Sequence, residues 1–409
     1  MPLLLLAAIL CATVSAALPA LAADFQFIPS LSLSEEFNDN ILDTAVGKRS
    51  DFITRLRPGA AMIYRAPSLN GDLSYNFDYH YYARGTRENE KNHLLALHAS
   101  AALVDNFFFI EGSDTLSRVP LDVARDVTGE SLFANQTDQN RGSVSPYLLW
   151  RLGGKGTLKT GYRFTDTSYL GSPGIDRREH KAFADLSHEP AASLQIYAGY
   201  AYASVATDLD DFDQHDVSSG FSYEYADKSF FYGGIGNSWQ AFSDMRRTSS
   251  LFWHAGISRD FSSLVAKLET RVQYAEDPLT VSTKETSYRA SLEKALQHGT
   301  VGVSSSYSKY LYTTTGSRER RTAAVSGSAR YEMSPRLGVS VALTGDKVSR
   351  ETLLDYAYHF SGTGGVSYGF NHEIRVLLNY SYIEYRHELD SATDARQTNR
   401  VVVEVRKVF

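Results

Sequence analysis

The chain ends in Asn399-Arg400-Val401-Val402-Val403-Glu404-Val405-Arg406-Lys407-Val408-Phe409, and this stretch decides the expected fold. Side chains alternate between the two faces of a strand, so Val401, Val403, Val405 and Phe409 share one face and the charged residues fall on the other. One apolar face, one charged face and a terminal aromatic residue are typical of the last strand of an outer-membrane β-barrel. A soluble sheet can also end this way, so this interpretation requires the same pattern throughout the chain.

The two-residue alternation recurs along the sequence. Its clearest example places Leu73, Tyr75, Phe77, Tyr79 and Tyr81 on one face, opposite Ser74, Asn76, Asp78 and His80. Another apolar row, which we expect to face lipid, is Leu264, Ala266, Leu268, Val272 and Tyr274. Strands of about ten or more residues with this repeat are typical of membrane barrels, whereas strands of soluble sandwiches are usually about half as long. We therefore predict an all-β fold, a transmembrane antiparallel up-and-down β-barrel.

The polar connections alternate between short and long. Residues 104–106 and 334–336 are short turns, whereas residues 117–138 and 275–283 are longer links. Short periplasmic turns and longer extracellular loops produce this alternation. It predicts about 20 strands with both chain ends in the periplasm, and 18 strands is the second choice because residues 107–110 alternate weakly.

Residues 1–23 are expected to form a secretory signal peptide, which leaves residues 24–409 as the barrel. Leu3 to Val14 form an apolar run, and Ala20-Leu21-Ala22 supplies small residues for cleavage. The first basic residue is Lys48, so we expect the true start codon to lie further upstream. The alternative is an uncleaved membrane helix, which Pro19 and the short apolar run disfavour. Cys11 is the single cysteine, so the barrel itself offers no disulfide or thiolate metal site.

Two stretches near the start resemble a known family. Ser34-Glu35-Glu36-Phe37-Asn38-Asp39-Asn40-Ile41 is followed by Asp51-Phe52-Ile53-Thr54-Arg55-Leu56-Arg57-Pro58-Gly59. Together they resemble the start of the β-barrel porins that accompany bacterial exopolysaccharide and PEP-CTERM sorting systems. The resemblance implies an outer-membrane barrel associated with polysaccharide export. The resemblance implies no catalytic residues for this chain, because the family has none that are established.

Sequence patterns for catalysis and metal binding are weak. Gly365-Val366-Ser367-Tyr368-Gly369 matches a serine-hydrolase motif, but that chemistry needs a strand-to-helix elbow and no helix is expected after it. An acidic cluster at Asp208, Asp210, Asp211, Asp213 and Asp216 does not have EF-hand spacing, and we interpret it as a solvated loop. The histidines are scattered without ligand spacing. We therefore expect no enzyme activity, no catalytic residues, no metal site and no cofactor.

The charged residues of the strands fall on the row opposite the apolar one. Arg or Lys at the lipid face near the bilayer midplane costs about 2–4 kcal/mol, so this confinement is informative. It favours a water-filled passage that selects solutes by field and width, and the alternative is a lumen closed by salt bridges. The expected lumen-lining residues are Arg55, Arg57, Asp78, Arg163, Glu224, Lys267, Glu269, Arg271, Arg289, Glu293, Arg330, Glu332, Arg375, Glu404 and Arg406.

We expect an outer-membrane channel for exopolysaccharide or other polar solutes, the former because of the resemblance. One alternative is a general small-solute porin, for which residues 117–138 would supply the constriction loop; another is a docking barrel of a secretion or electron-transfer assembly. A barrel-embedded lipid hydrolase is a third alternative. Expected partners are outer-membrane lipid, lipopolysaccharide, polysaccharide-export components and the barrel assembly machinery, which would read Val405 and Phe409 as a C-terminal signal. We expect no nucleic-acid partner.

Overall fold

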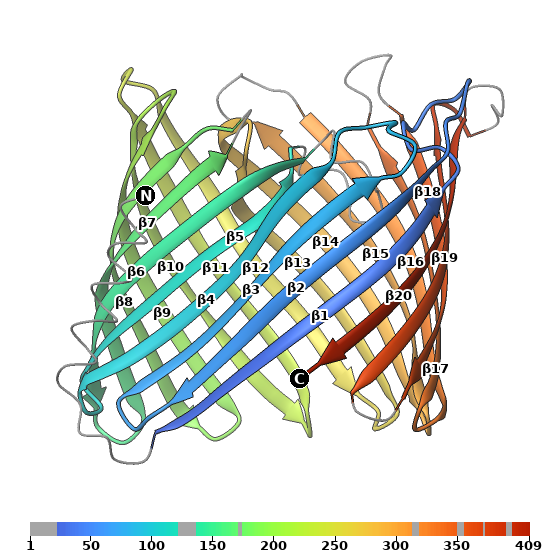
Figure 1. The fold of residues 1–409 in the computed structure, drawn as a ribbon. Coiled ribbons are helices and arrows are strands. Elements are labelled where there is room, and N and C mark those ends of the chain that lie inside the picture. Colours follow the sequence, from blue (N-terminus) through green and yellow to red (C-terminus); the bar gives the residue numbers. More distant parts are fainter. Residues whose placement is uncertain are drawn as a thin grey trace.

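The computed structural model describes residues 23–121, 136–170, 174–312, 319–349, 356–370, 373–389 and 395–409. Within these ranges the secondary structure is a 20-stranded sheet (Figure 1). No helix in the described ranges is long and apolar enough to span a membrane. The strands are β1 Asp24–Asn38, β2 Asp51–Arg65, β3 Leu69–Tyr82, β4 Glu90–Val104, β5 Phe108–Pro120, β6 Gln136–Leu152, β7 Gly156–Leu170, β8 Arg177–Ala191, β9 Leu194–Thr207, β10 Phe212–Ala226, β11 Ser229–Phe242, β12 Arg247–Asp260, β13 Leu264–Asp277, β14 Thr280–Leu296, β15 Gly299–Tyr312, β16 Glu319–Ser334, β17 Leu337–Val348, β18 Tyr358–Gly369, β19 Ile374–Arg386 and β20 Arg396–Val408.

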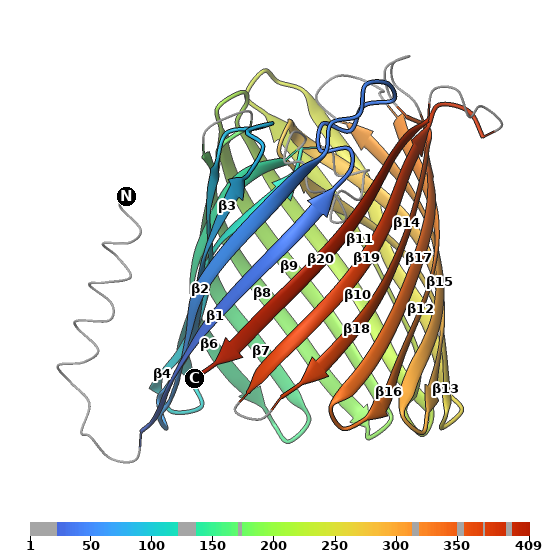
Figure 2. The ribbon, with the colours of Figure 1, turned by 45° about the vertical axis from the view of Figure 1, so that its right-hand side comes forward.

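The sheet closes on itself because the first and last strands pair. Each strand is antiparallel to its neighbours in sequence, and β1 also pairs with β20 from Ser30↔Val408 to Asn38↔Arg400 (Figure 2). The terminal Phe409 N–H donates to the Pro29 carbonyl at 2.9 Å. A closed sheet leaves no edge strand whose backbone groups would lack partners in lipid. The all-β barrel fold and the count of 20 strands are thus confirmed.

The apolar side chains point outward and remain uncovered. Leu268, Val325 and Leu343 expose 58%, 59% and 60% of their surface. The last strand follows the same rule, with Val401, Val403 and Val405 exposed and Val402 and Glu404 on the other face. Such a continuous apolar exterior would be unstable in water and requires hydrocarbon around it.

The barrel has no central hydrophobic core among its described residues. The buried apolar clusters are small and lie at the ends of strands: Ile41, Ile53 and Tyr82 form one, and Ala203, Val205, Phe212 and Phe242 another. A soluble sandwich would instead bury the inner faces of two sheets against each other. The inner wall of this barrel is polar, as a water-filled lumen requires.

The turns divide the barrel into two different ends. Short turns such as residues 153–155 and 227–228 lie at one end, here called the short-turn end. The other end, the long-loop end, carries longer links such as residues 39–50. One prediction about these links is wrong: residues 275–283 are not a long loop, because β13 extends to Asp277 and β14 begins at Thr280. Most of the expected link at residues 117–138 lies outside the described residues.

A lysine at Leu343 should destabilise the barrel, because this outward side chain lies midway along β17. We expect Leu343→Lys to lower the free energy of unfolding by about 2–4 kcal/mol, measured by urea titration of the barrel in lipid vesicles. Ala342→Lys is the matched control, since the neighbouring side chain points into the lumen. Equal losses for the two variants would contradict the assignment of the faces.

Candidate functional site

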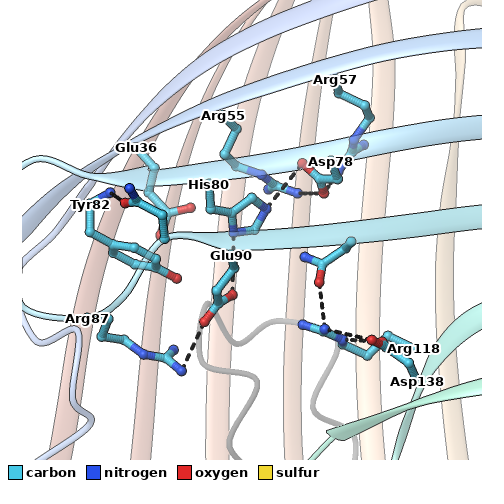
Figure 3. A network of polar contacts seen from close by, with 12 residues as sticks. Glu36, Arg55, Arg57, Asp78, His80, Tyr82, Arg87, Glu90, Arg118 and Asp138 are labelled. Atoms are coloured by element: carbon cyan, nitrogen blue, oxygen red, sulfur yellow. Dashed lines mark hydrogen bonds and ion pairs between the residues drawn. The ribbon is translucent and has the colours of Figure 1, made fainter. Parts of the chain in front are cut away.

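A polar network covers the inner wall near the long-loop end, where β2, β3 and β4 run side by side. Its centre is Asp78 on β3, a buried carboxylate that accepts hydrogen bonds from Arg55 and Arg57 of β2, both at 2.7 Å (Figure 3). His80 Nε2 lies 3.1 Å from the other Asp78 oxygen. Alternation along β2 and β3 places all four side chains on the lumen face, because Leu56 and Tyr79 between them point the other way. The two arginine charges are thereby held against one carboxylate.

The network continues onto β4, β5 and β6. The Glu90 carboxylate forms an ion pair with Arg87 at 3.0 Å and lies 3.9 Å from His80 Nδ1. Arg118 donates to Asp138 at 2.7 and 3.2 Å and to Asn92 at 2.6 Å (Figure 3). Charge-assisted contacts of this kind are shorter and stronger than neutral hydrogen bonds. This wall is therefore a rigid, largely neutralised lining.

The same chemistry joins the first and last strands. Arg400 of β20 donates to both oxygens of Glu36 of β1, at 3.0 and 2.9 Å, and Glu36 exposes 2% of its surface. In the adjacent β1–β2 link, Asp43 lies 2.9 Å from Arg396. Burial raises the pKa of Asp43 above its usual value, against the opposing effect of Arg396 and His359. These contacts fix the closing seam at the long-loop end.

The β13–β14 hairpin is folded into the mouth at the long-loop end. β12 and β13 pair only from Asp260↔Val265 to Trp253↔Val272, although both strands continue beyond that point. Above it, the Tyr274 hydroxyl lies near the side chains of Ser250 and Ser238, and Lys284 Nζ contacts Ser250 Oγ. Ser238 is completely buried, and its side chain belongs to the inner face of β11. Near the short-turn end, this face of the hairpin is exposed to lipid. Near the long-loop end, the same face packs against the inner wall of the barrel.

The hairpin tip reaches a different part of the mouth. The backbone N–H of Ile175, in the link between β7 and β8, donates to the Pro278 carbonyl at 2.8 Å. Ile175 also packs against the cluster of Ala203, Val205, Phe212 and Phe242. This backbone bridge narrows the opening. The prediction that Val272 and Tyr274 face lipid is wrong for this reason.

The structure brings few of the expected lumen residues together. Arg55, Arg57 and Asp78 form the cluster described above, and Lys267 pairs with Glu269 at 2.9 Å. The remaining residues are distributed around the wall: Arg163, Glu224, Arg271, Arg289, Glu293, Arg330, Glu332, Arg375, Glu404 and Arg406. Sequence reasoning missed His80, Arg87, Glu90, Arg118, Asp138, Glu36 and Arg400 as network members. Arg118 and Asp138 fall in the expected link at residues 117–138, and Arg87 lies between β3 and β4, so alternation along a strand does not place these three. All of the pairings depend on which parts of the chain become neighbours.

The candidate motifs for catalysis and metal binding lie in ordinary strand and loop positions. Ser367 lies in β18, whose strand continues to Gly369, so the elbow of a serine hydrolase is missing there. In the acidic cluster, Asp210 pairs with Arg246 at 2.6 Å and Asp213 accepts from Tyr202 at 3.0 Å. Among the described residues, no group of three or more His, Cys, Asp or Glu is placed to hold a metal ion.

Comparison with solved structures finds barrels of similar fold. The FrpB iron transporter of Neisseria meningitidis, in its F5-1 apoprotein form, aligns over 93% of this chain and 81% of its own, with a TM-score of 0.56 and 9% identity. The siderophore receptor PirA of Pseudomonas aeruginosa aligns over 93% and 80%, with a TM-score of 0.52 and 9% identity. A BenF-like porin of Pseudomonas fluorescens aligns over 94% and 99%, with a TM-score of 0.46 and 11% identity. At these identities the likeness to the first two shows the fold alone.

No family model and no curated protein matches this sequence. The resemblance to exopolysaccharide-associated porins consequently stays a prediction. The closed 20-stranded barrel with an apolar exterior and a polar interior defines the class, which is that of the outer-membrane β-barrels.

Removing the charge of Asp78 should weaken the barrel, because Arg55, Arg57 and His80 lose their shared acceptor. We expect Asp78→Asn to lower the free energy of unfolding by about 1–3 kcal/mol. Asp185→Asn is the control, since the described residues offer Asp185 no ion pair; its effect should stay within about 0.5 kcal/mol. Urea titration in lipid vesicles measures both, and similar losses would contradict a stabilising network.

Proposed function

We propose that this protein is a passive channel of the bacterial outer membrane, with both termini in the periplasm. The observation that carries the proposal is a closed 20-stranded barrel whose inner wall carries charged and hydroxyl side chains. Barrels of about 16 or more strands generally enclose an open or plugged lumen. A wall that carries charged and hydroxyl groups can exchange hydrogen bonds with a hydrated solute as it passes.

Transport through this lumen requires no covalent step. The paired arginines and carboxylates near the long-loop end give a polar wall of low net charge, and the β13–β14 hairpin narrows the entrance. Solutes would be selected by their size at the hairpin and by their charge along the wall. Polar molecules such as sugars fit these features.

Exopolysaccharide or its fragments are the cargo that the sequence resemblance favours. Several residues of the stretches that carry the resemblance are buried: Glu36 and Asn38 at the end of β1, and Asn40 in the link after it. Arg55 and Arg57, in the second stretch, donate to Asp78. These residues stabilise the long-loop end of the barrel. The cargo is therefore proposed from the sequence resemblance alone.

A general small-solute porin is the second candidate. An infolded segment that narrows the lumen is the feature such a porin needs, and the β13–β14 hairpin is a segment of this kind. A docking barrel without conductance is the candidate from a different class.

Two kinds of partner follow from the outer surface. Lys309, Arg321 and Lys347 face outward near the long-loop end, with Lys309 directly opposite Arg321. Apolar Tyr307, Val325 and Leu343 lie below them on the same face. We propose that these cations contact phosphates of lipopolysaccharide, and that the barrel assembly machinery reads Val405 and Phe409.

Planar-bilayer recording of the purified barrel tests the channel. We expect stepwise single-channel conductance, and permeation of neutral sugars in a liposome swelling assay. A folded barrel that gives neither would leave the docking alternative. Loss of secreted polysaccharide on gene deletion would favour the export cargo over general solutes.

Releasing the hairpin should widen the channel. Tyr274→Ala combined with Lys284→Ala removes the side-chain contacts with Ser238 and Ser250. We expect a larger single-channel conductance and faster uptake of large sugars. Tyr288→Ala, an outward aromatic substitution on β14, is the control and should leave conductance unchanged. An unchanged conductance of the double variant would show that the hairpin does not limit the flow.

A further inference from the structure

A second polar region lies on the inner wall near the short-turn end, away from the Asp78 network. It is a cavity of about 270 Å³ across β16, β17, β18 and β19. Arg330 of β16 and Arg375 of β19 line it from its two flanking strands. Arg336 lines it from the turn between β16 and β17. We call this cavity the arginine pocket.

The floor of the arginine pocket is made of residues with little or no side chain. Gly338 and Gly365 lie between Ser340, Ser367 and Asn379 on the lumen face. A Cβ atom at Gly365 would lie 2.3 Å from Asn379 Oδ1 and 3.0 Å from Ser340 Oγ, so a larger residue would displace these groups. The glycines thus keep a concavity whose walls offer hydroxyl and amide groups. Such close approach to the backbone is a recognised use of glycine in strands.

The charge of the arginine pocket is not balanced. Three arginines line it against one carboxylate, Glu332. Within the part of the chain that the structure describes, none of these arginines has an ion pair, in contrast to Arg55, Arg57, Arg118 and Arg400 at the other end. The excess positive charge is available to a ligand.

A neighbouring pair strengthens the positive field. Arg375 and Arg406 are direct cross-strand partners on β19 and β20, both on the lumen face. Like charges placed directly opposite each other destabilise a sheet. Glu404, the nearest acid on β20, accepts a hydrogen bond from Ser32 at 2.7 Å. A barrel that keeps this repulsion inside its lumen gains attraction for anions there.

We propose that the arginine pocket binds an oxyanion-bearing solute, with room for about one acidic sugar unit. Guanidinium groups recognise carboxylate and phosphate through paired, charge-assisted hydrogen bonds. The hydroxyl and amide groups of Ser340, Ser367 and Asn379 match the hydroxyl groups of a sugar ring laid over the glycine floor. This assignment rests on the proposed channel and adds to it a preference for anionic cargo at the short-turn end.

The test measures block of the wild-type channel by trigalacturonate, with maltotriose as the neutral counterpart and inorganic phosphate as the small oxyanion. We expect trigalacturonate to reduce current at concentrations where maltotriose has no effect. In Arg330→Gln/Arg375→Gln the half-blocking concentration should rise about tenfold, the change that the loss of about 1.4 kcal/mol produces. The reversal potential in a salt gradient should also shift toward cation preference.

Lys181→Gln is the matched control, because it removes one positive charge from the inner face of β8, on a distant part of the wall. Its block by trigalacturonate should equal that of the wild type. Block by phosphate as well as trigalacturonate supports a general oxyanion site, and block by trigalacturonate alone supports a carboxylated sugar. Equal block of the double variant, the control and the wild type overturns the assignment.

Calorimetric titration of the detergent-solubilised barrel with trigalacturonate separates this inference from the channel itself. Binding that is lost in Arg330→Gln/Arg375→Gln supports the arginine pocket even if no conductance is found. Conductance without any binding or block overturns the pocket and leaves the channel standing. Heat-modified migration on gels verifies that each variant is folded.

Discussion

The pairing of β1 with β20 is the constraint on which the whole molecule depends. In hydrocarbon, a backbone N–H or carbonyl without a partner costs several kcal/mol, and an open sheet would present a full row of such groups on each edge. The register from Ser30↔Val408 to Asn38↔Arg400 pairs these groups along the length over which the two strands overlap. Once the sheet is closed, the alternation of each strand must place one set of side chains in lipid and the other around an enclosed space. The Glu36–Arg400 contact fixes the seam where the two strands meet the mouth.

The described charged residues around the enclosed space are arranged in two ways, in ion pairs near the long-loop end and as an unpaired group of arginines near the short-turn end. Near the long-loop end, arginines are held by carboxylates, and this arrangement stiffens the wall while cancelling its field. Near the short-turn end, Arg330, Arg336 and Arg375 surround a glycine floor with only Glu332 among them. The first arrangement is that of a structural frame, and the second is that of a binding surface. A solute crossing the lumen would therefore meet a narrowed, nearly neutral entrance at one end and a positive region at the other.

The β13–β14 hairpin shows how a local pattern can be correct and its interpretation incomplete. Val272 and Tyr274 continue the apolar row that Leu268 begins, and alternation alone places all of them against lipid. The hairpin bends inward above Val272, so the same face now packs on the inner wall of β11 and β12. The burial of Ser238 and the hydrogen bond between Ile175 and Pro278 are tertiary contacts between residues far apart in the chain. A local sequence pattern therefore does not predict them.

The sequence by itself determined the class of fold, the number of strands and which side chains share one face of a strand, although not that Val272 and Tyr274 are covered. These properties follow from a two-residue period and from the spacing of polar turns, both of which are local. The tertiary structure decided which residues meet: Asp78 with two arginines of the preceding strand, Glu36 with Arg400 across the seam, and Arg330 with Arg375 across one cavity. Register and the inward bend of one hairpin set these distances, because they bring together residues that are far apart in the chain.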